Sequence, residues 1–186
     1  MYFTLVKKTY PQEDIIVRVL KDLIKEDYIK TESSDMYLVI YHNFDNLDSI
    51  SLSLETLSND MLFKLYAYNS LNADDKKLKE ELEIAKGLLD GIPVGCYNLK
   101  SAILKNNNIS DKKTILNFIL DGTGISEFFI NGYVDANLNV SYAAEILFLH
   151  RNTMLYKLNK LKELKGFDLR VFKDIYIIYN LMMDKW

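Results

Sequence analysis

The hydrophobic residues in the front part of the chain gather in short, dense runs. The runs at 2–7, 36–42 and 61–68 are rich in β-branched and aromatic residues. Such runs predict strands, and the run at 36–42 is best explained as a buried one. The stretch 46–59 fits two descriptions, because its apolar residues recur at helical spacing while part of it alternates as a strand does.

Two longer stretches of the front part show the periodicity of amphipathic helices. In 12–26 and 73–90 the apolar residues recur every three to four positions. Pro11 suits the first turn of the earlier helix, since the N–H that proline lacks would be unsatisfied there. Asn72 or Asp74 can cap the later helix, whose first turns are rich in acidic residues.

The order of elements predicts an α+β fold made of two domains. Residues 1–105, which end in a short helix over 98–105, form a small α/β domain for regulation or dimerisation. Residues 106–124 form a helical connection with a helix over 111–121. Residues 125–186 form an all-helical domain.

The periodicity of the last part predicts four helices. They span 126–136, 142–148, 151–164 and 171–184, and the hydroxyl of Ser141 can cap the second. The last helix is apolar on too many sides for a free surface helix, so it either completes the core or also supplies a dimer contact. Four side chains of the first helix are expected to point inward: Phe128, Phe129, Tyr133 and Val134.

The third of these helices has one apolar and one polar side. At about 100° per residue, five apolar side chains share one side: Met154, Leu155, Leu158, Leu161 and Leu164. The other side is polar and basic: Asn152, Tyr156, Asn159 and Lys160, flanked by Thr153 and Lys157. Amides and arginine read base edges, while lysine and tyrosine bind phosphates. Two short helices joined by a tight turn, the second one cationic, are typical of a helix-turn-helix.

Charge is unevenly distributed along the chain. The net charge of −3, taken alone, argues against a nucleic-acid partner. Residues 1–132 carry fifteen Lys and Arg against twenty Asp and Glu, whereas 133–186 carry eight against six. This concentration favours DNA binding, although a solvated helix face also explains it. Five cations stand against Glu163 within 149–165: Arg151, Lys157, Lys160, Lys162 and Lys165.

The composition argues against several kinds of site. With Cys96 as the one cysteine, neither an intrachain disulfide nor a cysteine-based zinc site can form. Cys96 is expected to be a buried small hydrophobe, and His42 to be structural. Two histidines are too few for a histidine-rich metal cage. No cofactor or metal is therefore expected.

The sequence also predicts where the protein works. No apolar run approaches the ~20 residues that a membrane-spanning helix needs. The start, MYFTLVKK, lacks the charged and apolar regions of a signal peptide. A cytoplasmic location is expected.

The sequence of the third helix and of the residues around it contains a more specific motif. HRNT at 150–153 is followed by Tyr156, Lys157 and Leu158, and then by GFDL at 166–169. This combination resembles the C-terminal helix-turn-helix of the PucR family of bacterial regulators, which includes purine-catabolism activators and sugar-diacid regulators. The resemblance covers about 126–184. Lys157 stands where the family usually has arginine, and Met154 where it usually has leucine.

The resemblance implies a DNA-binding transcription regulator that is not an enzyme. It also implies a degenerate GGDEF-like α/β domain ahead of the helix-turn-helix, although 1–105 contain no GGDEF-type motif. A homodimer is expected, because paired half-sites need paired helices. Family members are usually longer, so the chain is either a compact member or a fragment.

We expect eight residues to form the DNA-binding site. Arg151, Lys157 and Lys160 would anchor phosphates or bases, while His150 is either a cap or faces a phosphate. Asn152, Thr153 and Tyr156 would add specificity. Ser141 completes the set.

Two other functions stay open. The front domain could be a sensor for a small-molecule effector or a protein, with the helix-turn-helix secondary. The chain could also be an enzyme of the nucleotidyl-cyclase lineage, against which the absent motif and few glycines argue.

Overall fold

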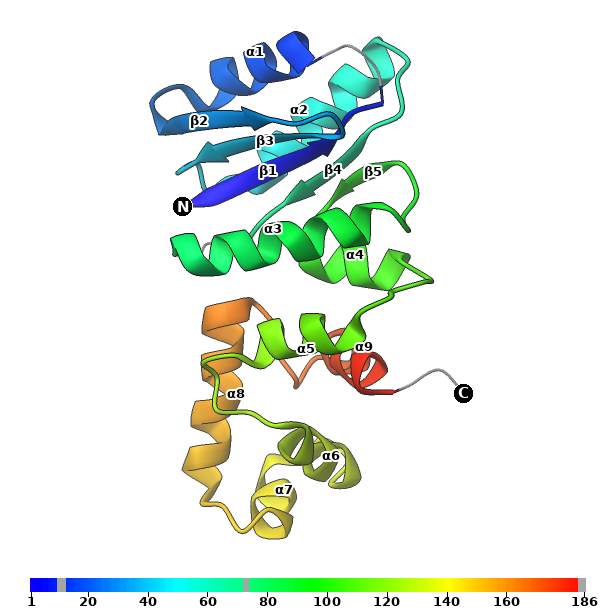
Figure 1. Cartoon of the computed structure of the whole chain (residues 1–186). Helices are drawn as coiled ribbons and strands as arrows, with labels where there is room; N and C mark the ends of the chain where they lie inside the picture. Colours follow the sequence, from blue (N-terminus) through cyan, green and yellow to red (C-terminus); the bar gives the residue numbers. More distant parts are fainter. Residues whose placement is uncertain (10–12, 72–73, 184–186) are drawn as a thin grey trace. The chain divides into compact units, whose positions relative to one another are not determined.

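The chain divides into two compact units, Met1–Ser110 and Asp111–Trp186, which we describe separately. The computed structural model describes residues 1–9, 13–71 and 74–183 (Figure 1). Three features predicted from the sequence lie outside these residues: Pro11, the alternative cap Asn72 and the end of the last helix at 184.

Unit 1 is built on a five-stranded sheet of order β2-β3-β1-β4-β5. β1 pairs antiparallel with both β3 and β4, β2 pairs antiparallel with β3, and β4 pairs parallel with β5. The strands are β1 Tyr2–Lys7, β2 Tyr28–Ser33, β3 Tyr37–His42, β4 Tyr66–Asn69 and β5 Gly95–Tyr97.

Helices cover both faces of this sheet. α1 and α2 lie against one face, and α3 and α4 against the other (Figure 1). The helices are α1 Glu13–Ile24, α2 Leu47–Asp60, α3 Asp75–Leu89 and α4 Leu99–Lys105, with a 3₁₀ turn over Lys25–Asp27. Because both faces are covered, β1 is buried on both sides, and Phe3, Leu5 and Val6 are at most 2% exposed.

The path of the chain through unit 1 is that of a split βαβ motif used twice. In the β1-α1-β2 unit the two strands are separated in the sheet by β3. In the β3-α2-β4 unit the two strands are separated by β1. This is the ferredoxin-like arrangement, here extended by α3, β5 and α4. Unit 1 is therefore a mixed α+β unit, which agrees with the α+β class predicted for the chain as a whole.

The predicted strands at 2–7 and 36–42 are confirmed, and 46–59 is helical, as α2. The strand predicted at 61–68 is wrong in its first half, because the chain turns after α2 and β4 begins at Tyr66. The sequence did not reveal β2 and β5. β2 is an edge strand without a buried residue, and β5 has three residues, so neither carries a strong apolar pattern.

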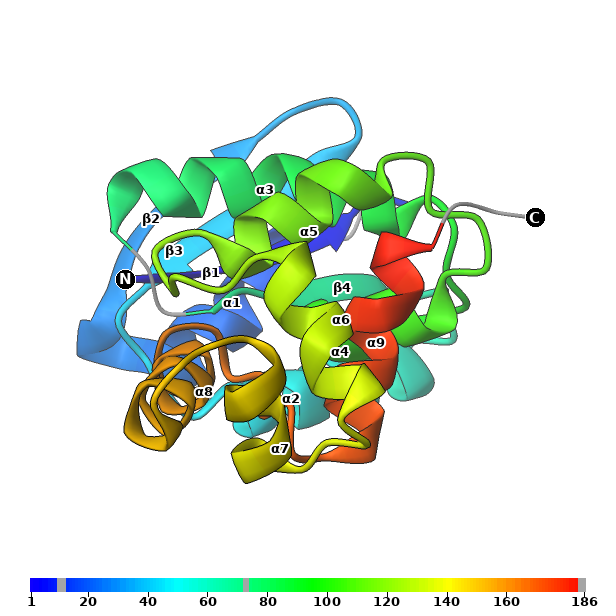
Figure 2. The same cartoon turned by 90° about the horizontal axis from the view of Figure 1, so that it is seen from below.

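Unit 2 contains five helices within its described residues. α5 packs against α9 and α8, α6 packs against α7, and α7 packs against α8 (Figures 1 and 2). They are α5 Lys112–Leu120, α6 Glu127–Asp135, α7 Val140–Ile146, α8 Arg151–Lys165 and α9 Phe172–Met182.

The contact between α6 and α7 depends on a glycine. A Cβ added to the buried Gly132 would lie 2.5 Å from Leu147 Cδ2. Leu147 thus occupies the space that any side chain at position 132 would need. Ala143 and Ala144 of α7 are also buried, and their small side chains take up little space in the packing of this helix. The prediction for Phe128 is wrong, since its ring is 73% exposed on the first turn of α6.

We expect Gly132→Val to lower the free energy of unfolding by roughly 2 kcal/mol, because Leu147 must leave a packed position. Gly87→Val in α3 is the matched control, as nothing lies within 4 Å of a Cβ there. The control should change the free energy by less than about 0.5 kcal/mol. Urea denaturation of the full chain measures both, and equal effects would show that the contact is not tight.

Candidate nucleic-acid interface

α8 begins and ends at well-defined residues. His150 is the N-cap, and its Nδ1 accepts a hydrogen bond of 3.2 Å from the backbone N–H of Asn152. At the other end Gly166 adopts a left-handed conformation with φ of 73°. The helix begins at the predicted residue and ends one residue after the predicted Leu164, and His150 serves as a cap.

One side of α8 lies in the core of unit 2. Met154, Leu158 and Leu161 are 0% exposed, as the helical periodicity predicts. The prediction that Leu164 belongs to the buried side is wrong, because this residue is 47% exposed. Lys165 is buried in its place, and its Nζ lies 3.8 Å from the centroid of the Phe118 ring of α5.

The other side of α8 faces solvent with mixed polar groups. Arg151, Asn152, Thr153 and Asn159 are exposed, and the ring of Tyr156 is 63% exposed. Amide, hydroxyl and guanidinium groups that line one face of a helix can hydrogen-bond to base edges and phosphates.

The basic side chains of α8 differ in what already holds them. Arg151 Nε donates a 3.1 Å hydrogen bond to Ser141 Oγ of α7. The half-buried Lys157 donates from Nζ to the carbonyl oxygen of Gly124, in the loop between α5 and α6. Lys160 Nζ lies 5.9 Å from the Tyr156 ring centroid.

Ser141 is not the cap of α7. Asn139 is the N-cap, and its side chain accepts hydrogen bonds from the backbone N–H groups of Ser141 and Tyr142 at 3.0 and 3.1 Å. Because the side-chain oxygen of Asn139, two residues before Ser141, accepts from both backbone N–H groups, α7 begins at Val140. The Ser141 hydroxyl is consequently available to Arg151.

The segment that follows α8 holds the C-terminal end of this helix in place. Phe167 and Leu169 are 0% exposed, and Asp168 between them bonds Arg170 Nε at 2.7 Å and Lys162 Nζ at 3.3 Å. The hydrogen bond from Arg170 is the main reason that the pKa of Asp168 falls to about 2. The two apolar side chains and the ion pairs together anchor this segment.

Comparison with known proteins identifies the arrangement. Residues 130–180 match the family of PucR C-terminal helix-turn-helix domains. Residues 130–180 are thus similar to a PucR-type helix-turn-helix domain. The resemblance stated from the HRNT and GFDL motifs is thereby confirmed over these residues.

Two proteins similar to the chain carry names of regulators. The carbohydrate diacid regulator of Escherichia coli K12 is 33% identical over 60 residues, which are 32% of this chain and 16% of that protein. The crystal structure of a regulator of polyketide synthase expression from Bifidobacterium adolescentis superposes with a TM-score of 0.50. That likeness covers 98% of this chain and 78% of the other at 12% identity, so it concerns the fold.

In the PucR-type domain, the residues predicted to bind DNA come from two helices and their connection. Arg151, Asn152, Thr153, Tyr156, Lys157 and Lys160 lie on α8, Ser141 on α7 and His150 in the turn between them. Sequence reasoning did not foresee Asn139 as the cap or Gly124 as the partner of Lys157. An asparagine before an apolar run could have revealed the first, whereas the second is a tertiary contact.

Unit 1 offers less chemistry. His42 is 0% exposed, its Nε2 lies 3.2 Å from Thr4 Oγ1, and burial lowers its pKa. Burial raises the pKa of Cys96 to about 11, which leaves it a poor nucleophile. Among residues 1–9, 13–71 and 74–183, no three His, Cys, Asp or Glu side chains are placed to hold a metal ion. Within the same ranges, no helix has the length and apolar character needed to cross a membrane.

We expect Asp168→Asn to lower the free energy of unfolding by about 2 kcal/mol at neutral pH. The folded-state pKa lies below the unfolded value near 3.9, so the stabilisation is present above that pH and is lost as pH falls towards 2. In the variant this loss on acidification should be smaller. Urea denaturation across this pH range tests it.

Asp135→Asn at the exposed end of α6 is the matched control and should behave as the wild-type chain does. The same pH dependence in all three proteins would mean that Asp168 contributes little to stability.

Proposed function

We propose that the chain is a transcription regulator that binds double-stranded DNA through α8 and is not an enzyme. The observation that supports this most is the two-sided character of α8. Its inner side is held by Met154, Leu158 and Leu161, and its outer side presents Asn152, Thr153 and Tyr156 to solvent. A helix in this setting can enter the major groove with its outer side against the bases.

The residues of the interface have distinct roles in this proposal. Asn152 and Thr153, on the first turn of α8, contact base edges, and Tyr156 adds specificity one turn later. Arg151, oriented by Ser141, and Lys160 bind phosphates or a guanine edge.

Two further residues support the interface from beside it. His150 caps α8 by accepting from the N–H of Asn152, which fixes the residue at which the helix begins. Lys157 contributes charge while its bond to Gly124 holds the loop before α6. In this proposal Lys157 is thus a positioning residue as much as an anchor.

We propose that unit 1 serves regulation or dimerisation, as a degenerate relative of GGDEF domains that has lost catalysis. The ferredoxin-like path of its chain supports this, and so does the absence of a GGDEF-type motif from the sequence. A small-molecule effector would act through this unit. Since the DNA of a bacterium lies in the cytoplasm, the protein would work there.

The double variant Arg151→Ala/Lys160→Ala should bind DNA more weakly, and its affinity should depend less on salt. Each phosphate-binding cation that is removed lowers the slope of log affinity against log salt by about 1. The duplex is one that the full wild-type chain selects from a random library, and fluorescence anisotropy at several salt concentrations measures the slope.

Lys113→Ala/Lys173→Ala is the matched control, since it removes two exposed cations of the same unit that lie on α5 and α9. Its slope should stay near that of the wild-type chain. Equal slopes for both double variants would contradict the assignment of Arg151 and Lys160.

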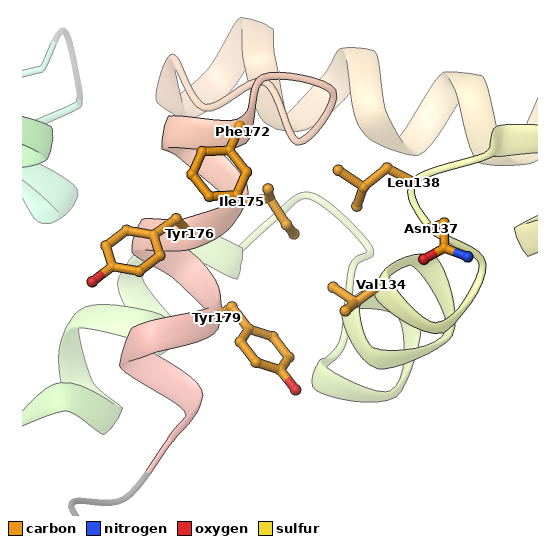
Figure 3. A pocket seen from close by; sticks show the side chains of 7 residues that line it. All are labelled: Val134, Asn137, Leu138, Phe172, Ile175, Tyr176 and Tyr179. Atoms are coloured by element: carbon orange, nitrogen blue, oxygen red, sulfur yellow. The ribbon is translucent and has the colours of Figure 1, made fainter.

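We also propose that the chain forms a homodimer through α9. Phe172 is 76% and Tyr176 53% exposed, and their rings stack with centroids 6.2 Å apart. Both rings form part of the wall of an apolar groove of about 350 Å³ between α9 and the end of α6 (Figure 3). In a two-fold interface the exposed rings of each copy can fill the groove of the other, which would pair two recognition helices.

Phe172→Lys/Tyr176→Lys should convert the dimer to a monomer, because each copy would have to bury two charges in an apolar contact. Sedimentation velocity of the full chain measures the mass. Phe128→Lys, at a ring 73% exposed on α6, is the control and should leave the dimer intact. A wild-type chain that sediments as a monomer would refute the dimer.

A further inference from the structure

The end of α7 has a feature that the proposed interface does not use. After the last helical residue, Phe148 adopts a left-handed conformation with φ of 52°. Its N–H bonds the carbonyl of Glu145 at 3.1 Å, and the N–H of Leu149 bonds the carbonyl of Ala144 at 2.8 Å. These two bonds define a Schellman motif, in which the left-handed position is usually glycine and sometimes asparagine.

Other helices of the same unit end with the residues that this position favours. α6 closes with the same pair of bonds around Asn137, whose φ is 52°. α8 closes with Gly166, whose φ is 73°. A bulky aromatic residue is disfavoured in the left-handed region, so Phe148 is the unusual one of the three.

The ring of Phe148 contributes nothing to the fold of unit 2. It is 96% exposed, and among the residues that the structure describes no large hydrophobic side chain is more exposed. The bonds that close α7 are made by backbone atoms alone. Neither packing nor capping therefore explains a phenylalanine here.

The position of Phe148 suggests what the ring contacts. It lies in the turn between α7 and α8, two residues before the N-cap His150. It is three positions before Arg151, so the Cα atoms of the two residues are at most about 11 Å apart. A duplex that touches the first turn of α8 therefore passes within reach of the ring.

We propose that Phe148 is a DNA-contacting residue whose ring packs against apolar surface of the duplex, the thymine methyl groups and the deoxyribose edges at the rim of the groove. This rests on the proposed function of α8. Apolar contact with a thymine methyl is a known way for proteins to read DNA, and apolar side chains also pack at base steps. The contact carries no charge, so it adds affinity that salt does not screen.

A second residue in the chain separates backbone strain from DNA contact. Leu62 of unit 1 follows α2 in the same motif, with φ of 54° and 91% exposure. Its N–H bonds Asn59 at 3.4 Å, and the N–H of Phe63 bonds Ser58 at 3.1 Å. An exposed bulky residue in this conformation is therefore tolerated away from α8, and Leu62→Gly is the matched control.

The test compares Phe148→Gly, Phe148→Trp and Leu62→Gly in the full chain, on a duplex that the wild-type chain selects from a random library. Both glycine variants should melt at or above the wild-type temperature, because glycine accepts the left-handed conformation without strain. Phe148→Gly should bind about tenfold more weakly, with an unchanged salt dependence. Phe148→Trp should restore binding, and Leu62→Gly should bind as the wild-type chain does.

Two results would overturn the proposal. Phe148→Gly could bind the duplex with wild-type affinity, and if that variant also failed to regulate a reporter gene, the ring would serve a protein partner. Weaker binding could persist in Phe148→Trp although an aromatic ring is restored, which would indicate a structural role. If the wild-type chain selects no duplex at all, the proposed function fails and this contact with it, whereas either of the first two results leaves the proposed function standing.

Discussion

The burial of one stripe of α8 is the constraint on which the proposed interface depends. Met154, Leu158 and Leu161 are all 0% exposed, and together they fix the rotation of the helix about its axis. A shift by one residue would turn the helix by about 100° and bring its polar side into the core, where unpaired polar groups are costly. The direction in which Asn152 and Tyr156 point is therefore a consequence of packing on the opposite side.

Local signals were sufficient to predict the helices of the C-terminal unit. The start of α8 follows from His150 and the periodic apolar residues after it, and its end follows from Gly166, because caps and periodicity are properties of neighbouring residues. The same reasoning predicted the strands β1 and β3, whose residues are buried on both faces of the sheet.

Features that depend on distant residues were beyond the sequence. Leu164 fits the apolar stripe of α8, yet Lys165 is buried because the Phe118 ring of α5 lies beneath it. Edge strand β2 is held in the sheet by its backbone pairing with β3 and has no buried residue of its own. The bond between Lys157 and Gly124 joins residues 33 positions apart, and no local pattern records it.

The partners of the lysines on α8 have a thermodynamic consequence. Lys157 is bonded to a carbonyl, Lys162 is paired with Asp168, and Lys165 is buried on an aromatic ring. Of these three contacts, the pair with Asp168 is the one that offsets a charge, but all three restrain the side chain, so in the proposed interface Arg151 and Lys160 would make the closest ionic contacts with a polyanion. Fewer ions would be displaced from the duplex when α8 docks, so the complex would owe less of its stability to counterion release and more to shape and hydrogen bonding.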